Sequence, residues 1–64
     1  MLIQRSLSDP HTTVALESVF WGYLDNFAKA NNQKWHKYIK KLLESKPPGQ
    51  NTASYLRCYV VESL

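Results

Sequence analysis

The chain has 64 residues, a hydrophobic content of 44% and a formal net charge of +3. A chain of this length forms one domain at most, and its core is marginal unless a metal, disulfides or a second copy supports it. Cys58 is the only cysteine, which excludes an intramolecular disulfide and fits a reducing compartment.

No apolar run is long enough for the core of a secretion signal or for a membrane span. We therefore expect a cytoplasmic protein without a membrane partner. The basic balance favours a polyanionic or acidic partner, although many small proteins are as basic. Six of the eight basic residues are lysines between positions 29 and 46.

Residues 1–10 form an N-terminal arm, which could be an extra strand or a flexible tail and which ends in the turn signal S-D-P. Residues 11–17 then alternate as a strand does, with Val14 and Leu16 on one face. The other face carries His11, Thr13, Ala15 and Glu17. A lone strand cannot satisfy its own backbone groups, so the pattern predicts antiparallel pairing with the same strand of a second copy. Such a two-stranded ribbon is narrow enough to enter the major groove of DNA.

Two amphipathic helical patterns follow the strand. The first starts near Ser18, whose hydroxyl can cap it, and ends at Asn32, which tolerates the left-handed conformation. The second runs from about 34 to 45, with an apolar stripe opposite a lysine-rich face. Two prolines and a glycine then form a loop, and Asn51 can cap a third helix. We therefore expect an arm at 1–10, a strand–helix–helix core at 11–46, a loop at 47–50 and a C-terminal helix at 51–64.

The expected fold class is mainly α with one short β-strand. Its apolar residues would form a core shared by two copies of the chain, because so small a chain buries little surface alone. The residues expected in this dimer core are Val14, Leu16, Phe20, Trp21, Leu24, Ile39 and Leu42.

Three segments resemble a known family: T-T-V-A-L-E-S-V-F-W at 12–21, A-N-N-Q-K-W at 30–35 and N-T-A-S-Y-L-R-C-Y-V-V-E at 51–62. Together they resemble the ribbon-helix-helix family of the Arc and MetJ type, and in particular a small bacterial subfamily with an extra C-terminal helix. The F-W pair and the N-x-x-S-x-L-R segment are the most specific parts, and the resemblance covers roughly residues 11–63.

The resemblance implies an intertwined homodimer whose two strands pair antiparallel across the two-fold axis and lie in the major groove. Carried over by position, the base-contacting residues are His11, Thr13 and Ala15. A helix N-terminus presents free N–H groups and partial positive charge, so the start of the second helix would bind the phosphates. The residues expected at the phosphates are Gln33, Lys34, Trp35 and Lys37.

These residues also have purely structural interpretations. Thr13 and Ala15 could be only the solvent face of a strand, and His11 an exposed turn histidine. Lysines at helical spacing commonly form a solvated face, and tryptophans commonly lie in cores. Neither H-E-x-x-H nor C-x-x-C nor a glycine-rich phosphate loop occurs, so we expect no catalysis, no cofactor and no metal.

The leading hypothesis is therefore sequence-specific binding to double-stranded DNA by a homodimer, as a bacterial or phage transcriptional repressor. The alternative is a dimeric protein-interaction module on the same fold, which binds another protein through the C-terminal helix or the arm. Positive potential on the ribbon side favours DNA binding, whereas a large exposed apolar patch elsewhere favours the interaction module.

Overall fold

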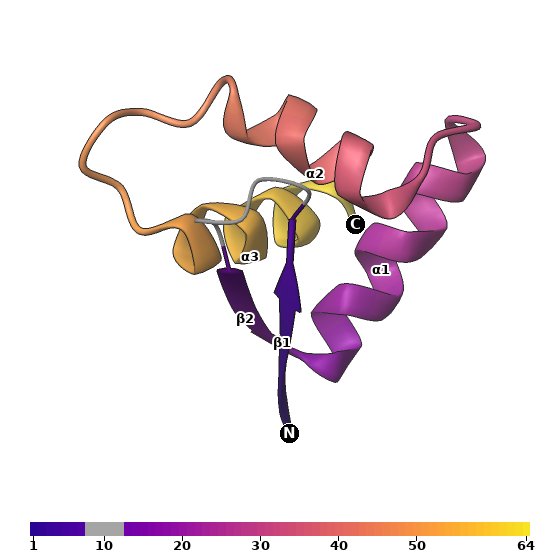
Figure 1. Ribbon diagram of the computed structural model, residues 1–64, viewed down its shortest axis with the longest axis horizontal. Helices are drawn as coiled ribbons and strands as arrows, with labels where there is room; N and C mark the ends of the chain where they lie inside the picture. The colour runs from indigo at the N-terminus through magenta and orange to yellow at the C-terminus, as the bar shows by residue number, and fades with distance from the viewer. Residues whose placement is uncertain (8–12) are drawn as a thin grey trace.

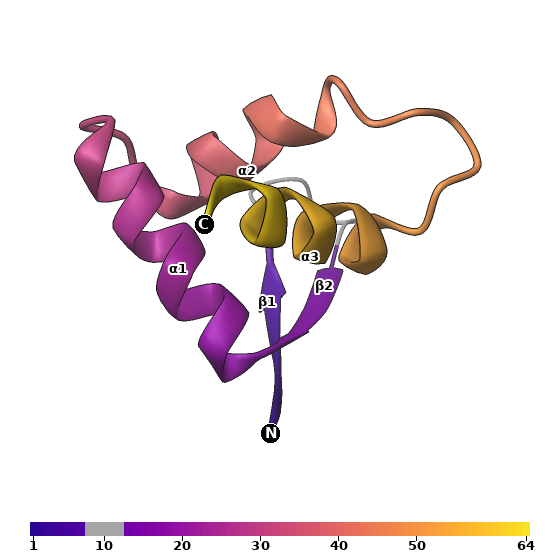
Figure 2. The same cartoon turned by 180° about the vertical axis from the view of Figure 1, so that it is seen from behind.

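The computed structural model describes residues 1–7 and 13–64 of the chain. In chain order, the elements are the strands β1 (Leu2–Ser6) and β2 (Thr13–Glu17) and the helices α1 (Ser18–Ala30), α2 (Trp35–Leu43) and α3 (Thr52–Ser63). The three predicted helices are thus confirmed, with slightly different ends. The helices gather around the strand hairpin, and the N-terminus projects away from them (Figures 1 and 2).

β1 and β2 form an antiparallel two-stranded hairpin within one chain, with Ile3 opposite Leu16 and Arg5 opposite Val14. The expectation of a single strand without a partner in its own chain is therefore wrong, and the extra-strand alternative for the arm is confirmed. The sequence of β1 does not show the alternation of apolar and polar residues that marks a strand, because Arg5 takes an inward position. Leu2 takes an outward position and is 60% exposed.

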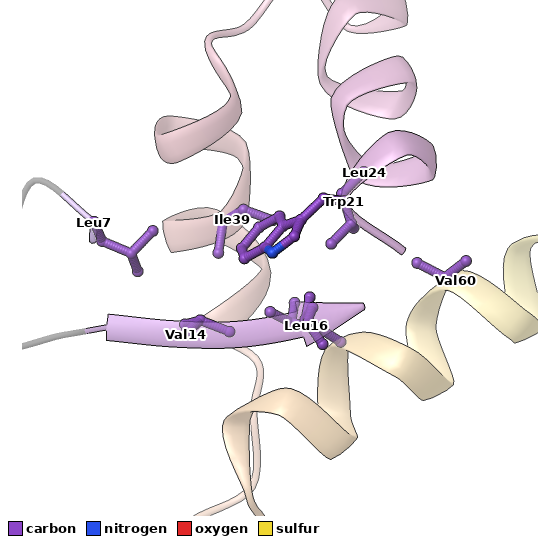
Figure 3. Close-up of a cluster of buried hydrophobic side chains, with 8 residues drawn as sticks. Leu7, Val14, Leu16, Trp21, Leu24, Ile39 and Val60 are labelled. Atoms are coloured by element: carbon purple, nitrogen blue, oxygen red, sulfur yellow. The ribbon is translucent and has the colours of Figure 1, made fainter. Parts of the chain in front are cut away.

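One apolar core lies between the inner face of the hairpin and the helices (Figure 3). Leu16, Leu24 and Ile39 are completely buried. Figure 3 shows Leu16 on β2 beneath the ring of Trp21. The indole Nε1 of Trp21 donates to the carbonyl of Ile3 at 2.8 Å, which satisfies the one polar atom of that buried side chain.

Most of the side chains predicted for the dimer core are buried, whereas Phe20 and Leu42 are only partly buried against it. All of these side chains belong to the core of a single chain, so their role in a core shared by two copies stays a prediction.

Local hydrogen bonds explain where the helices begin and end. Asn32 closes α1 with a φ of 56°, as its residue type predicts. Asn51 caps α3, as expected, because its side chain accepts a hydrogen bond from the N–H of Ser54 at 3.1 Å. The expectation that Ser18 caps α1 is wrong, because its N–H donates to the carbonyl of Met1 at 3.0 Å and the capping position is Glu17. The carbonyl of Met1, just before β1, thus accepts the hydrogen bond from the backbone N–H of Ser18.

Two polar contacts tie α3 to the rest of the fold. Arg57 donates two hydrogen bonds to the carboxylate of Glu17, at 2.9 and 3.0 Å. The hydroxyls of Tyr38 and Tyr59 lie 2.7 Å apart, and burial together with this hydrogen bond raises the pKa of Tyr38 to about 12. Tyr38 therefore remains a neutral hydrogen-bonding group at any physiological pH.

Candidate nucleic-acid interface

The outer face of the hairpin is short, polar and mostly open to solvent. Gln4 lies opposite Ala15, and Ser6 lies opposite Thr13. Gln4, Ser6 and Thr13 are exposed, and the hydroxyls of Ser6 and Thr13 are 3.5 Å apart. Because residues opposite each other in an antiparallel pair share a face, these side chains form one surface. We call these four residues the hairpin face.

Two of the residues predicted to contact bases lie on this face. Thr13 is exposed, whereas Ala15 is half-buried beside the first turn of α3, where both line a surface depression with residues 51–53. His11 lies outside the described residues. Gln4 and Ser6 were missed because residues 1–10 were assigned to an arm. The signal that could have identified them is the turn motif S-D-P, which separates two segments long enough to be strands.

The hairpin face has no positive side chain among the residues that the structure describes. Glu17, at the end of β2, is the nearest acidic group along the strand, and Arg57 pairs with it. The hydrogen bond from Arg57 lowers the pKa of the Glu17 carboxyl below its usual value. The pair therefore stays ionised near neutral pH, and its two charges offset each other beside the hairpin.

Arg5 lies on the opposite, inner side of the hairpin. Its guanidinium donates to both carboxylate oxygens of Asp25, at 2.8 and 3.1 Å. It also lies 4.6 Å from the ring centroid of Trp21 and 5.0 Å from that of Trp35. Such a planar, stacked and bidentate cation is held firmly in place. Arg57 is ion-paired as well, so both arginines of the chain are held in ion pairs within the fold.

The residues predicted at phosphates divide into two groups. Lys34, at the N-cap of α2, and Lys37, one turn later, are exposed. Gln33 and Trp35 are half-buried, and the ring of Trp35 packs edge-on against Trp21 at 5.8 Å. No side chain caps the start of α2, so its first N–H groups have no side-chain acceptor there. The two lysines are therefore the members of the predicted set that a ligand could reach.

The lysines of α2 form a positive surface along one side of the helix. Lys37, Lys40 and Lys41 are exposed and line a shallow depression together with His36 and Glu44. The sequence alone could not separate this surface from an ordinary solvated helix face. Because both arginines are ion-paired, these lysines carry much of the surface positive charge that an anionic partner would meet.

Apolar side chains are exposed on other parts of the surface. Val19 and Tyr23 of α1 are 58% and 38% exposed, and Val61 of α3 is 61% exposed. The ring centroid of Tyr23 lies 6.4 Å from that of Phe27, and the ring centroid of Phe27 lies 6.1 Å from that of Tyr59. Aromatic contacts thus lead from the surface of α1 into the fold. These helices therefore offer an apolar surface that the single chain does not cover.

The described residues give little support to other chemistries. No group of three or more His, Cys, Asp or Glu side chains within residues 1–7 and 13–64 could hold a metal ion. Over the same part of the chain, no helix combines the length and apolar character that a membrane crossing requires. Cys58 is exposed and forms no disulfide.

The hairpin, the helix pair and the third helix together point to one family. Residues 3–64 match the ribbon-helix-helix domain family, which is nearly the whole chain. The chain belongs to this family. The match confirms the resemblance read from the sequence and extends it to most of β1. Ribbon-helix-helix domains are DNA-binding and not enzymes; they are typically regulators that dimerise. Searches of curated proteins and of solved structures returned no match.

Proposed function

We propose that this ribbon-helix-helix domain acts as a homodimer that binds double-stranded DNA sequence-specifically and represses transcription. The observation that carries the proposal is the family match together with an exposed, narrow and polar hairpin face. A two-stranded antiparallel ribbon fits the major groove, which is about 12 Å wide. Thr13 can hydrogen-bond a base edge there, and Ala15 can contact a thymine methyl group.

In the proposed dimer, β2 pairs antiparallel with β2 of the partner copy. β1 occupies one edge of β2, and among the described residues no strand occupies the other edge. Pairing along that second edge places the two β2 strands side by side as the ribbon that enters the groove, with the two β1 strands outside it. The sequence-based reason for a dimer, a strand without a partner, no longer holds. Family membership and the uncovered apolar side chains of α1 and α3 now support it.

Phosphate binding falls to the start and the exposed side of α2. Lys34 lies at the helix N-terminus, where free N–H groups and partial positive charge favour an anion. Lys37 lies one turn farther along and adds charge on the exposed side. These contacts position the protein without reading sequence, whereas the hairpin face supplies the base contacts.

Thr13→Ala and Lys34→Ala should therefore have different effects on DNA binding. We expect Thr13→Ala to reduce the preference for a selected site while leaving non-specific affinity nearly unchanged. Lys34→Ala should weaken binding to all sequences alike. It removes two phosphate contacts per dimer, so the slope of log K against log salt should become shallower by about 2 units from a wild-type slope of about −5 or steeper.

The measurement is selection of bound duplexes from a random pool, followed by fluorescence anisotropy across a salt series. Lys46→Ala is the matched control, because that ammonium already donates to the carbonyl of Gln50 at 2.7 Å. Its salt slope should equal that of the wild type. A wild type that binds no duplex at low salt, or slopes that neither variant changes, contradicts the proposal.

The oligomeric state provides an independent test. We expect sedimentation velocity at micromolar concentration to show a dimer, because a chain of 64 residues gains stability by covering its exposed apolar side chains. Val61→Asp places a charge on the exposed side of α3 and should shift the equilibrium toward monomer if that side is covered. A folded wild-type monomer at these concentrations is incompatible with the homodimer.

A second candidate function is a protein-interaction module on the same fold. The exposed Val19, Tyr23, Val61 and Leu64 favour it, since they lie on α1 and at the end of α3 rather than on the hairpin face. DNA would then bind weakly or not at all, and the hairpin would serve only the fold. The anisotropy series separates the two functions, because only the DNA-binding protein shows a site preference that Thr13→Ala reduces.

A further inference from the structure

A cavity lies where the turn after α1, the helix α2 and the helix α3 meet, and its volume is about 370 Å³. Its lining includes Tyr38 of α2 and Tyr55 and Tyr59 of α3, so we call it the tyrosine cavity. Tyr38 is buried, and the other two tyrosines are half-buried. Small-molecule sites in proteins have volumes of roughly 300–1,000 Å³. The tyrosine cavity is near the lower end of this range and suits a molecule with one ring.

The side chain of Gln33, which lines the cavity, has a polar atom without a partner. Its oxygen Oε1 is shielded from solvent, and no described residue donates a hydrogen bond to it. A buried acceptor without a donor destabilises a fold, so such atoms are rare. The terminal torsion of a glutamine side chain is soft, which lets Oε1 turn toward a donor in the cavity. The fold thus provides an acceptor for a hydrogen-bond donor that its described residues do not supply.

The cavity also offers hydrogen-bond donors that suit an anion. Lys41 lines it, is exposed and forms no ion pair with a described residue. Among the described lining residues, no other side chain is charged. The hydroxyls of Tyr38 and Tyr59, which we call the tyrosine pair, share one hydrogen bond of 2.7 Å. That bond uses one of their two hydrogens, so the other can donate to a third group. A carboxylate accepts from an ammonium and from a phenol hydroxyl alike.

We infer that the tyrosine cavity binds a one-ring aromatic carboxylate that also carries a hydroxyl group. The carboxylate accepts hydrogen bonds from Lys41 and from the tyrosine pair, and the ligand hydroxyl donates to Oε1 of Gln33. The ring packs against the tyrosine rings and the side chain of Leu42, which also lines the cavity. This site adds a small-molecule partner to the proposed function and does not depend on DNA binding.

The test is isothermal titration calorimetry of the whole chain at neutral pH with three probes of nearly equal size. 4-Hydroxybenzoate has both groups, benzoate lacks the hydroxyl, and 4-hydroxybenzamide lacks the negative charge. We expect 4-hydroxybenzoate to bind about tenfold more tightly than benzoate, which leaves the buried acceptor of Gln33 unpaired. It should bind about fivefold more tightly than 4-hydroxybenzamide, because a charge pair with the exposed Lys41 contributes less.

Two variants assign these preferences to their side chains. Gln33→Leu should abolish the preference for the hydroxyl and keep the preference for the charge, and Lys41→Gln should do the reverse. Lys29→Gln is the matched control, since Lys29 is exposed on α1 and does not line the cavity; it should keep both preferences. Thermal melting verifies that each variant is folded, and the comparison of probes on the wild type needs no variant.

A wild type that binds none of the probes at millimolar concentration, or binds all three equally, overturns the inference, and the cavity then holds only water. Preferences that persist in Gln33→Leu and Lys41→Gln overturn it as well. The titration contains no DNA, so either result leaves the proposed DNA binding to its own test.

Discussion

Replacing Leu16 with aspartate should leave the chain unfolded at neutral pH. Leu16 has no exposed surface, and its neighbours in the core are the apolar side chains of Trp21, Leu24 and Leu56. No charged side chain is buried among the described residues, and the polar atoms of the buried Trp21 and Tyr38 are already hydrogen-bonded, so the new carboxylate would find no partner. An unpaired buried charge costs several kcal/mol, whereas a domain of this size has a total stability of roughly 3–10 kcal/mol.

Circular dichroism and thermal melting measure this effect directly. We expect Leu16→Asp to show neither the helical signal nor a cooperative transition. The control is Ser54→Asp, which introduces the same charge at an exposed position in the first turn of α3, where the helix dipole favours an acid. That variant should melt within a few degrees of the wild type. A helical Leu16→Asp protein with a cooperative transition contradicts the central place of Leu16 in the core.

The helices and the core side of β2 followed from the sequence because their apolar residues recur at the periods of regular structure. Val14 and Leu16 alternate, and the stripe of α1 repeats at helical spacing, so burial could be assigned before any tertiary contact was known. The ends at Asn32 and Asn51 followed because asparagine has specific local roles there.

β1 could not be read in the same way. Its inward positions hold Ile3 and Arg5, and an inward arginine breaks the apolar alternation that identifies a strand. Arg5 is tolerated there only because Asp25 lies twenty positions later in the sequence and two tryptophans provide faces for its guanidinium. Such a contact depends on tertiary structure, and local pattern does not reveal it.

The candidate interface was predictable only in part for the same reason. Thr13 was placed on the correct face because strand alternation alone determines it. Gln4 was missed, since its position depends on the register between β1 and β2. That Lys34 is exposed while Trp35 is half-buried against Trp21 depends on how α2 docks, although the two residues are adjacent in the sequence.

Deleting residues 50–64, which include α3, should destabilise the protein by most of its folding free energy. The deletion removes Leu56 and Val60, both completely buried, and exposes the apolar surface that they cover on β2 and α1. Burying one such side chain contributes about 1.5–3 kcal/mol, so the two together approach the total stability of a domain this small. The deletion also leaves Glu17 and Tyr38 without Arg57 and Tyr59.

Thermal melting of the truncated chain should show either no transition or one lowered by tens of degrees. Leu56→Ala isolates the packing contribution and should cost about 2–5 kcal/mol, the usual range for a buried leucine. Val61→Ala is its control, because Val61 follows in the same helix but is 61% exposed and should cost little. An unchanged melting temperature after the deletion would mean that β2, α1 and α2 complete a core without α3. In that case α3 would be a detachable element whose apolar face binds something other than its own chain. That result would favour the protein-interaction function over DNA binding.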